Sequence, residues 1–180
     1  MATGKSQFIG AAGQFYVAYK LSQHNINASI TIGNAPSVDI IASSDDGRYS
    51  LSFQVKTSRN AYRNKKWHCG PGYEWSVGAS VIGKYKESFW YALIDLQENN
   101  GIWNPKVFFV PSEWVAKFVK PEFSMHNYYL SSKTNNLEAI EKKTLERWDL
   151  VKAYLKGDQM AIDWANNWPE NELARWGTEE

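Results

Sequence analysis

A β-hairpin in the first third of this 180-residue chain restricts the possible folds more than any other feature. Two runs rich in β-branched and aromatic residues, Val38–Ser43 and Tyr49–Thr57, have the composition of β-strands. The residues between them include Asp46-Gly47, a pair that favours a type I′ turn because both residues tolerate a positive φ. The sequence therefore predicts two antiparallel strands joined by a tight turn.

The register of this hairpin brings polar residues together. If Asp46 and Gly47 occupy the turn, Asp39 lies directly opposite Gln54 on the neighbouring strand. Because side chains alternate along a strand, Ser52, Gln54 and Lys56 point to one face, and Leu51, Phe53 and Val55 point to the other. Asp39, Gln54 and Lys56 are thus expected to form one polar patch.

The patch has residue types that suit phosphodiester hydrolysis. The carboxylate of Asp39 can bind a hard divalent cation, and the amide carbonyl of Gln54 can bind the same ion. The ammonium group of Lys56 can pair with a phosphate oxygen or orient an attacking water. The other interpretation is that these are ordinary polar residues on the exposed face of a hairpin.

Three short motifs extend the hydrolytic interpretation. They are Gly13-Gln14 in a helical segment, Ser37-Val38-Asp39-Ile40-Ile41 in the first hairpin strand, and Phe53-Gln54-Val55-Lys56-Thr57 in the second. Their order and spacing over residues 5–60, about a third of the chain, resemble the PD-(D/E)XK (restriction-endonuclease-like) nuclease superfamily. In that family a helix carries an acid, an Asp begins the second strand, and an acid-x-Lys motif follows in the third.

The resemblance implies an α/β (α+β) fold in which a central mixed β-sheet is flanked by helices. It also implies cleavage of nucleic acid that depends on Mg²⁺ or Mn²⁺. The implied catalytic residues are Asp39, Gln54 and Lys56, with Gln14 lining the site from the helix. The implied metal ligands are Asp39, Gln54 and the backbone carbonyl of Val55.

The chain departs from the family pattern at three positions. Gln54 and Gln14 stand where the family usually has acids, and Pro36 lies three residues before Asp39 instead of beside it. Asp39 is therefore the single carboxylate of the motif set. Because one carboxylate holds Mg²⁺ weakly, substrate phosphate has to supply further negative ligands, unless the loop that carries Glu74 folds back toward the site.

The remaining elements predict a mixed architecture. Residues 5–24 have the period of an amphipathic helix, whose apolar stripe consists of Phe8, Ala11, Ala12, Phe15, Ala18 and Tyr19. Further strands are expected at 28–32, 89–96, 106–110 and 128–130, a short helix after Pro111, and helical structure from Asn136 onward. We therefore expect a nuclease-like core over residues 1–135 and a C-terminal helical extension over 136–180 that packs on the same domain.

The distribution of charge is uneven. A net charge of +1 excludes nucleic-acid binding through bulk charge alone. However, the residues that follow Lys56 include four more cations and an indole, and no acid lies among them: Arg59, Arg63, Lys65, Lys66 and Trp67. We expect residues 57–75 to form a long surface loop whose cations contact phosphates while Trp67 stacks on a base. A solvated loop without a ligand is the other interpretation.

Neither a membrane segment nor a signal peptide is predicted, because no apolar run is long enough and the first residues lack the required pattern. Cys69 is the single cysteine, so no internal disulfide is possible, and a cytoplasmic location is expected. Trp164, Trp168 and Trp176 lie in an acidic, amphipathic tail whose spacing is compatible with the interface of a homodimer.

These observations favour a metal-dependent endonuclease, with Mg²⁺ or Mn²⁺ as cofactor and nucleic acid, DNA in preference to RNA, as substrate. A nucleic-acid-binding module with a degenerate site is an alternative on the same fold. A protein-interaction domain is a third hypothesis, because aromatic residues make up 15% of the chain and can form a surface that binds another protein.

Overall fold

A five-stranded sheet forms the centre of the computed structural model, which describes residues 4–32, 37–64, 71–83, 85–119, 126–131 and 137–167. Its strands, in spatial order, are β1 (Asn27–Ile30), β2 (Ile40–Ser43), β3 (Ser50–Ser58), β6 (Phe89–Asp95) and β9 (Lys106–Pro111). β3 and β6 are parallel, and the other neighbouring pairs are antiparallel. The prediction of a central mixed sheet is therefore confirmed.

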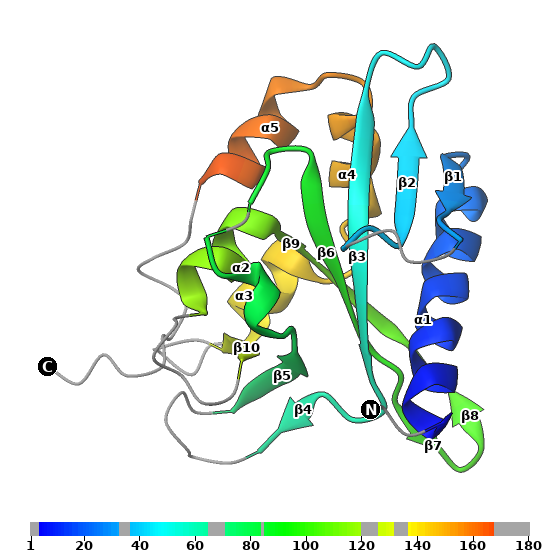
Figure 1. The fold of residues 1–180 in the computed structure, drawn as a ribbon, viewed down its shortest axis with the longest axis vertical. Helices are drawn as coiled ribbons and strands as arrows, with labels where there is room; N and C mark the ends of the chain where they lie inside the picture. The colour runs from blue at the N-terminus through cyan, green and yellow to red at the C-terminus, as the bar shows by residue number, and fades with distance from the viewer. Residues whose placement is uncertain are drawn as a thin grey trace, which may run out of the picture.

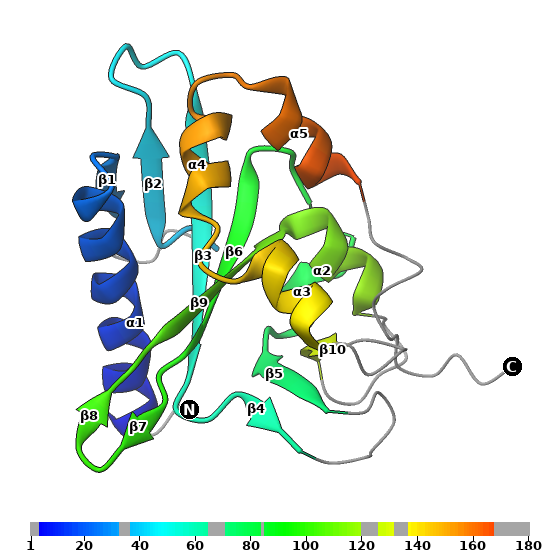
Figure 2. The ribbon, with the colours of Figure 1, turned by 180° about the vertical axis from the view of Figure 1, so that it is seen from behind.

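Helices lie on both faces of this sheet. They are α1 (Gly4–Gln23), α2 (Ser112–Phe118), α3 (Leu137–Thr144), α4 (Trp148–Tyr154) and α5 (Gln159–Asn166). Helices α1, α4 and α5 bury side chains in a cluster on one face, and α2 and α3 contribute to a second cluster on the other. Figures 1 and 2 show α1 beside β1 and β2 at one edge of the sheet, with the hairpin of β7 (Glu98–Asn99) and β8 (Ile102–Trp103) next to its beginning.

Two smaller sheets complete the arrangement. One consists of β10 (Asn127–Ser131), β5 (Gly72–Ser76) and β4 (Tyr62–Arg63), and the other is the hairpin of β7 (Glu98–Asn99) and β8 (Ile102–Trp103); a short 3₁₀ helix, η1, covers Ala79–Val81. The prediction of a surface loop over 57–75 is thus wrong for a part of that segment. Tyr73 and Trp75 alternate along β5 and are buried against the central sheet, which turns this stretch into a strand.

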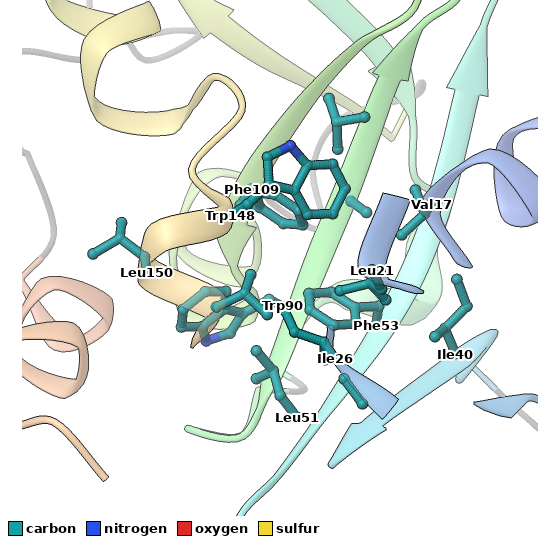
Figure 3. Close-up of a cluster of buried hydrophobic side chains, with 14 of the residues drawn as sticks. Val17, Leu21, Ile26, Ile40, Leu51, Phe53, Trp90, Phe109, Trp148 and Leu150 are labelled. Atoms are coloured by element: carbon teal, nitrogen blue, oxygen red, sulfur yellow. The ribbon is translucent and has the colours of Figure 1, made fainter. Parts of the chain in front are cut away.

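The first buried cluster is built around the apolar face of β3 (Figure 3). Phe53 lies 5.7 Å from Phe109 and 6.5 Å from Trp90, measured between ring centroids. Val17 and Leu21 of α1 pack against the same cluster. Aromatic rings in such contacts bury large apolar areas, so this face fixes how α1 and α4 lie on the sheet.

The hairpin has the predicted register, with Ile40 opposite Phe53 and Ser43 opposite Ser50. Its turn is different from the predicted type I′ turn. Gly47 has a φ of 69°, but Asp46 is not among the described residues with a positive φ. Asp46 instead accepts hydrogen bonds from the Ser44 hydroxyl and the Arg48 amide, which stabilises a longer loop with the same strand register.

Helix α1 confirms the predicted helix but buries a different face. Three aromatic residues of the predicted stripe are exposed: Phe8 is 79% exposed, Phe15 63% and Tyr19 56%. The face toward the sheet instead includes Gly13 and Val17, which are buried. A helix approaches a sheet most closely through its smallest side chains, and Gly13 provides this contact with β3.

Residues 137–167, the described part of the predicted helical extension, contain the three helices α3, α4 and α5. The break between α3 and α4 falls at Glu146, whose φ is 52°, and at Leu145, which makes a β-bridge with Phe108. Trp164 of the predicted interface is half-buried, with its ring centroid 5.0 Å from that of Trp90, while Trp168 and Trp176 lie outside the described residues. In the part of the chain that the structure describes, no helix is long and apolar enough to cross a membrane.

Candidate active site

Asp39 lies at a β-bulge where β2 begins. Ile40 is the strand partner of Phe53, yet the Asp39 amide also donates a hydrogen bond to the carbonyl of Phe53, at 2.8 Å. The Asp39 carbonyl turns the other way and accepts from the Thr31 amide beyond the end of β1. Two residues of one strand therefore face one residue of the other, so Asp39 does not lie directly opposite Gln54 as the regular register predicts. A bulge of this kind redirects a side chain.

The redirected carboxylate of Asp39 reaches the edge of β3. Its Oδ2 atom accepts a hydrogen bond of 2.7 Å from the amide of Val55, and no donor among the described residues is bonded to Oδ1. Residues 54–58 of β3 extend past the beginning of β2 and pair with β6 on their other side. Because the amide and the carbonyl of one strand residue point the same way, the carbonyl of Val55 is directed to the edge where Asp39 lies.

Helix α1 holds this edge in place through Gly13 and Gln14. The Nε2 atom of Gln14 donates a hydrogen bond of 2.9 Å to the backbone carbonyl of Asp39. The contact depends on Gly13, since a Cβ atom there would collide with the hydroxyl of Thr57 and come within 2.8 Å of Ile94 Cδ1. Gln14 and Asp39 are therefore brought together as expected, through the main chain of Asp39.

Lys56 is a half-buried cation near Asp39. Burial lowers the pKa of its ammonium group below the ordinary value, and the negative charge of Asp39 opposes part of that shift. The two side chains form no ion pair in the structure, so each retains capacity for a ligand. A partly dehydrated ammonium group beside a carboxylate interacts with an anion more strongly than a cation in water does.

Gln54 lies on the same face of β3 as Lys56, next to Tyr91 of β6. Its side chain is partly buried, and its carboxamide makes no hydrogen bond within the described part of the chain. The amide oxygen is thus available as a neutral ligand or acceptor. Of the four predicted residues, Gln14 comes from α1, Gln54 and Lys56 come from β3, and Asp39 immediately precedes β2.

These oxygen donors fit a divalent cation that is completed by substrate. Mg²⁺ is commonly bound through one or two carboxylates together with substrate phosphates and water. Asp39, the Val55 carbonyl and the Gln54 amide supply oxygen atoms of this kind. Among the described residues, no group of three or more His, Cys, Asp or Glu residues could hold a metal ion without them. Glu74 does not add a carboxylate, because Asn127, Tyr129 and Arg63 occupy it in the small sheet.

The predicted nucleic-acid contacts are only partly described. Arg59 lies 5.5 Å from the ring of Trp103 in a cation–π contact, and Arg63 forms a 3.1 Å ion pair with Glu74. Lys65, Lys66 and Trp67 lie outside the described residues. Arg63 is thus held by its own chain in this structure.

Known proteins give no guidance to this site. No protein-family model, curated protein or solved structure matches the chain.

Sequence reasoning overlooked two features beside the site. One is Thr57, whose hydroxyl is buried without a hydrogen-bond partner in the described part of the chain and fills the space above Gly13. The other is a hollow lined by Tyr85, Lys86 and Tyr91, among other residues. The Gly13 contact has a sequence signal, an isolated glycine within a helix, whereas the hollow is formed by segments distant along the chain.

Proposed function

We propose that this protein is a metal-dependent endonuclease with a restriction-endonuclease-like core, acting on nucleic acid with DNA as the favoured substrate. The observation that carries the proposal is the convergence of Asp39, at the bulge before β2, and Lys56 of β3 at one edge of β3. The order of elements supports it: α1 precedes three antiparallel strands, and the chain then returns to β6, which is parallel to β3. The bond from Gln14 to Asp39 links the helix to the same edge.

Each residue has a role that follows from its contacts. The Val55 amide fixes one oxygen of Asp39, so the other oxygen is directed to a ligand. In this proposal Lys56, half-buried near Asp39, pairs with a non-bridging phosphate oxygen and stabilises the negative charge that develops during hydrolysis. Gln14 is a positioning residue that acts through the main chain of Asp39.

A bound Mg²⁺ or Mn²⁺ would polarise the phosphate and promote ionisation of the attacking water. Asp39, the Val55 carbonyl and Gln54 would hold it, together with the phosphate itself. Substrate phosphate is thus a required part of the ligand set, because one carboxylate alone is a weak site.

The test is cleavage of labelled DNA and RNA, single-stranded and duplex, with Mg²⁺ or Mn²⁺. We expect the wild type to cut at least one substrate and Asp39→Asn and Lys56→Met to be slower by roughly 100-fold or more, since each removes a charge from the transition-state environment. Asp45→Asn and Lys152→Met are matched controls that remove the same charges from the hairpin loop and from α4. Equal rates for Asp39→Asn and the wild type would refute the assignment.

A second function, nucleic-acid binding without catalysis, is favoured by one specific observation. Within the described ranges, no group of three or more His, Cys, Asp or Glu residues is arranged to hold a metal ion. A binding module would retain the fold and use Lys56 and Arg59 for phosphate contacts. It predicts affinity that falls with salt, does not change with Mn²⁺, and is accompanied by no cleavage on any substrate.

A further inference from the structure

A hollow of about 560 Å³ adjoins the candidate active site. Val38, which immediately precedes Asp39, and Ser52, two residues before Gln54 on the same face of β3, are part of its lining. Tyr91, the strand partner of Gln54, is another part. Two strand residues span about 7 Å, so the hollow begins about that far along β3 from Gln54 of the proposed site of hydrolysis. Its volume lies within the usual range of small-ligand sites, roughly 300–1,000 Å³.

Aromatic rings form much of the lining. Tyr85 is 54% exposed, and the rings of Phe89 and Tyr91 are in a tilted contact, with a centroid distance of 5.4 Å and an interplanar angle of 53°. Tyr91 is only 2% exposed, yet its hydroxyl has no hydrogen-bond partner in the part of the chain that the structure describes. Burial raises the pKa of Tyr91 to about 12, so this hydroxyl remains a neutral donor and acceptor at physiological pH.

The polar part of the lining is uncharged except for one lysine. Lys86 is the sole ionisable cation of the lining that the structure describes, and no described carboxylate belongs to the lining. Besides the tyrosine hydroxyls, the lining has the hydroxyls of Ser37, Ser52, Ser80 and Ser88, which both donate and accept hydrogen bonds. Such a surface combines stacking faces and hydrogen-bonding groups with a single charge suited to a phosphate.

The segment that carries Lys86 is anchored before any ligand binds. The Ser112 hydroxyl, at the start of α2, accepts from the Lys86 amide at 3.0 Å and donates to its carbonyl at 2.9 Å. Ser112 is itself buried. Tyr85 and Lys86 are therefore held at the rim of the hollow by a fixed main chain, which lowers the entropy lost on binding.

We propose that this hollow binds an unstacked nucleobase next to the phosphate that is cleaved, so that the substrate is single-stranded or locally unpaired nucleic acid. The inference rests on the proposed function, because it places the base relative to Asp39 and Lys56. A base inside a B-form duplex is paired and stacked, and it cannot enter a hollow on a sheet face without being extruded. A base of a single strand is free to enter, and aromatic rings accept any base because each has a π-face.

The experiment measures binding separately from cleavage. Fluorescence anisotropy with EDTA present would compare the full chain on a labelled single DNA strand of about 12 nucleotides and on the duplex of the same sequence. We expect the single strand to bind more tightly. Tyr85→Ala should weaken single-strand binding about tenfold and leave duplex binding within about twofold, whereas Tyr85→Phe should retain single-strand affinity. Tyr19→Ala is the matched control, because Tyr19 on α1 is 56% exposed, close to the value for Tyr85.

The two proposals fail in different ways. The base-binding hollow is refuted if Tyr85→Ala binds the single strand as tightly as Tyr19→Ala does, or if the duplex binds at least as tightly as the single strand. The nuclease proposal is then decided separately, by the cleavage assay. If the single strand binds through Tyr85 but neither Mg²⁺ nor Mn²⁺ produces cleavage, the hollow is supported and the nuclease proposal is refuted.

Discussion

Gly13→Ala is expected to destabilise the protein and disturb the candidate site, although alanine is the better helix former. A Cβ atom at position 13 would overlap the hydroxyl of Thr57 and lie 2.8 Å from Ile94 Cδ1, with the Thr57 Cβ at 3.0 Å. The helix must then move away from β3. That movement lengthens or breaks the hydrogen bond from Gln14 to Asp39, because the donor sits on the next residue of the helix.

The magnitude follows from three opposing effects. Overpacking of a close contact costs about 1–3 kcal/mol of folding free energy. Loss of the Gln14–Asp39 hydrogen bond adds about 1 kcal/mol. The higher helix propensity of alanine offsets up to about 1 kcal/mol. The steric effect therefore prevails, and Gly13→Ala should lower the free energy of unfolding by about 1–3 kcal/mol.

The same helix contains a matched control. Gly10 has no atom within 4 Å of the position that a Cβ would occupy, so Gly10→Ala should raise the free energy of unfolding by up to about 1 kcal/mol. Urea unfolding at constant m-value measures both changes. A background with Thr57→Ala and Ile94→Val removes the two nearest colliding atoms and should reduce the penalty of Gly13→Ala to about 1 kcal/mol or less. If Gly13→Ala stabilises the wild type as Gly10→Ala does, the close approach of α1 to β3 is wrong.

Four further predictions concern other contacts. Gly157 has a φ of 71°, and a Cβ atom there would meet the Tyr49 ring. Gly157→Ala should therefore lower the free energy of unfolding by at least about 1 kcal/mol in urea titrations. An unchanged value would contradict the strained turn. Asp95 is fully buried and accepts a hydrogen bond from a buried backbone amide, so Asp95→Ala should cost about 1–3 kcal/mol in the same assay. Burial in the folded state lowers the pKa of Lys56 below its unfolded value of about 10.4. Between the two pKa values the unfolded chain holds a proton that the folded chain lacks. The free energy of unfolding of the wild type, relative to that of Lys56→Met, should therefore rise with pH in that window. Asp39→Asn should lower the pKa of Lys56 further, and an NMR titration of its ammonium group that shows no change would contradict their proximity.

The hairpin was predictable because its determinants are local. Apolar residues alternate along β3, and a one-residue slip would move Leu51 and Phe53 out of the core, so the register has one solution. The Asn100-Gly101 pair between β7 and β8 contains the same kind of turn signal, with φ values of 53° and 79°, and was not recognised. Turn type was less predictable, since the side-chain bonds of Asp46 favoured a longer loop.

The parts of the site that escaped prediction depend on contacts between distant segments. The bulge at Asp39 requires that its carbonyl pair with Thr31 of the β1 segment while its amide pairs with Phe53. The buried face of α1 is selected by the fit of Gly13 against β3, although the aromatic spacing had indicated another face. The burial of Lys56 likewise arises from tertiary packing that no local pattern in β3 contains.

The most direct test of the central claim, a divalent-metal site built on Asp39 beside Lys56, is calorimetric titration of Mn²⁺ in the presence of a single-stranded phosphorothioate oligonucleotide that resists cleavage. The wild type should bind one Mn²⁺ per chain when the oligonucleotide is present and much more weakly without it, because phosphate supplies ligands that the protein lacks. Asp39→Asn should abolish this binding, whereas Asp45→Asn should leave it unchanged. Equal Mn²⁺ binding by the wild type and Asp39→Asn, or none by the wild type with the oligonucleotide present, would contradict the account.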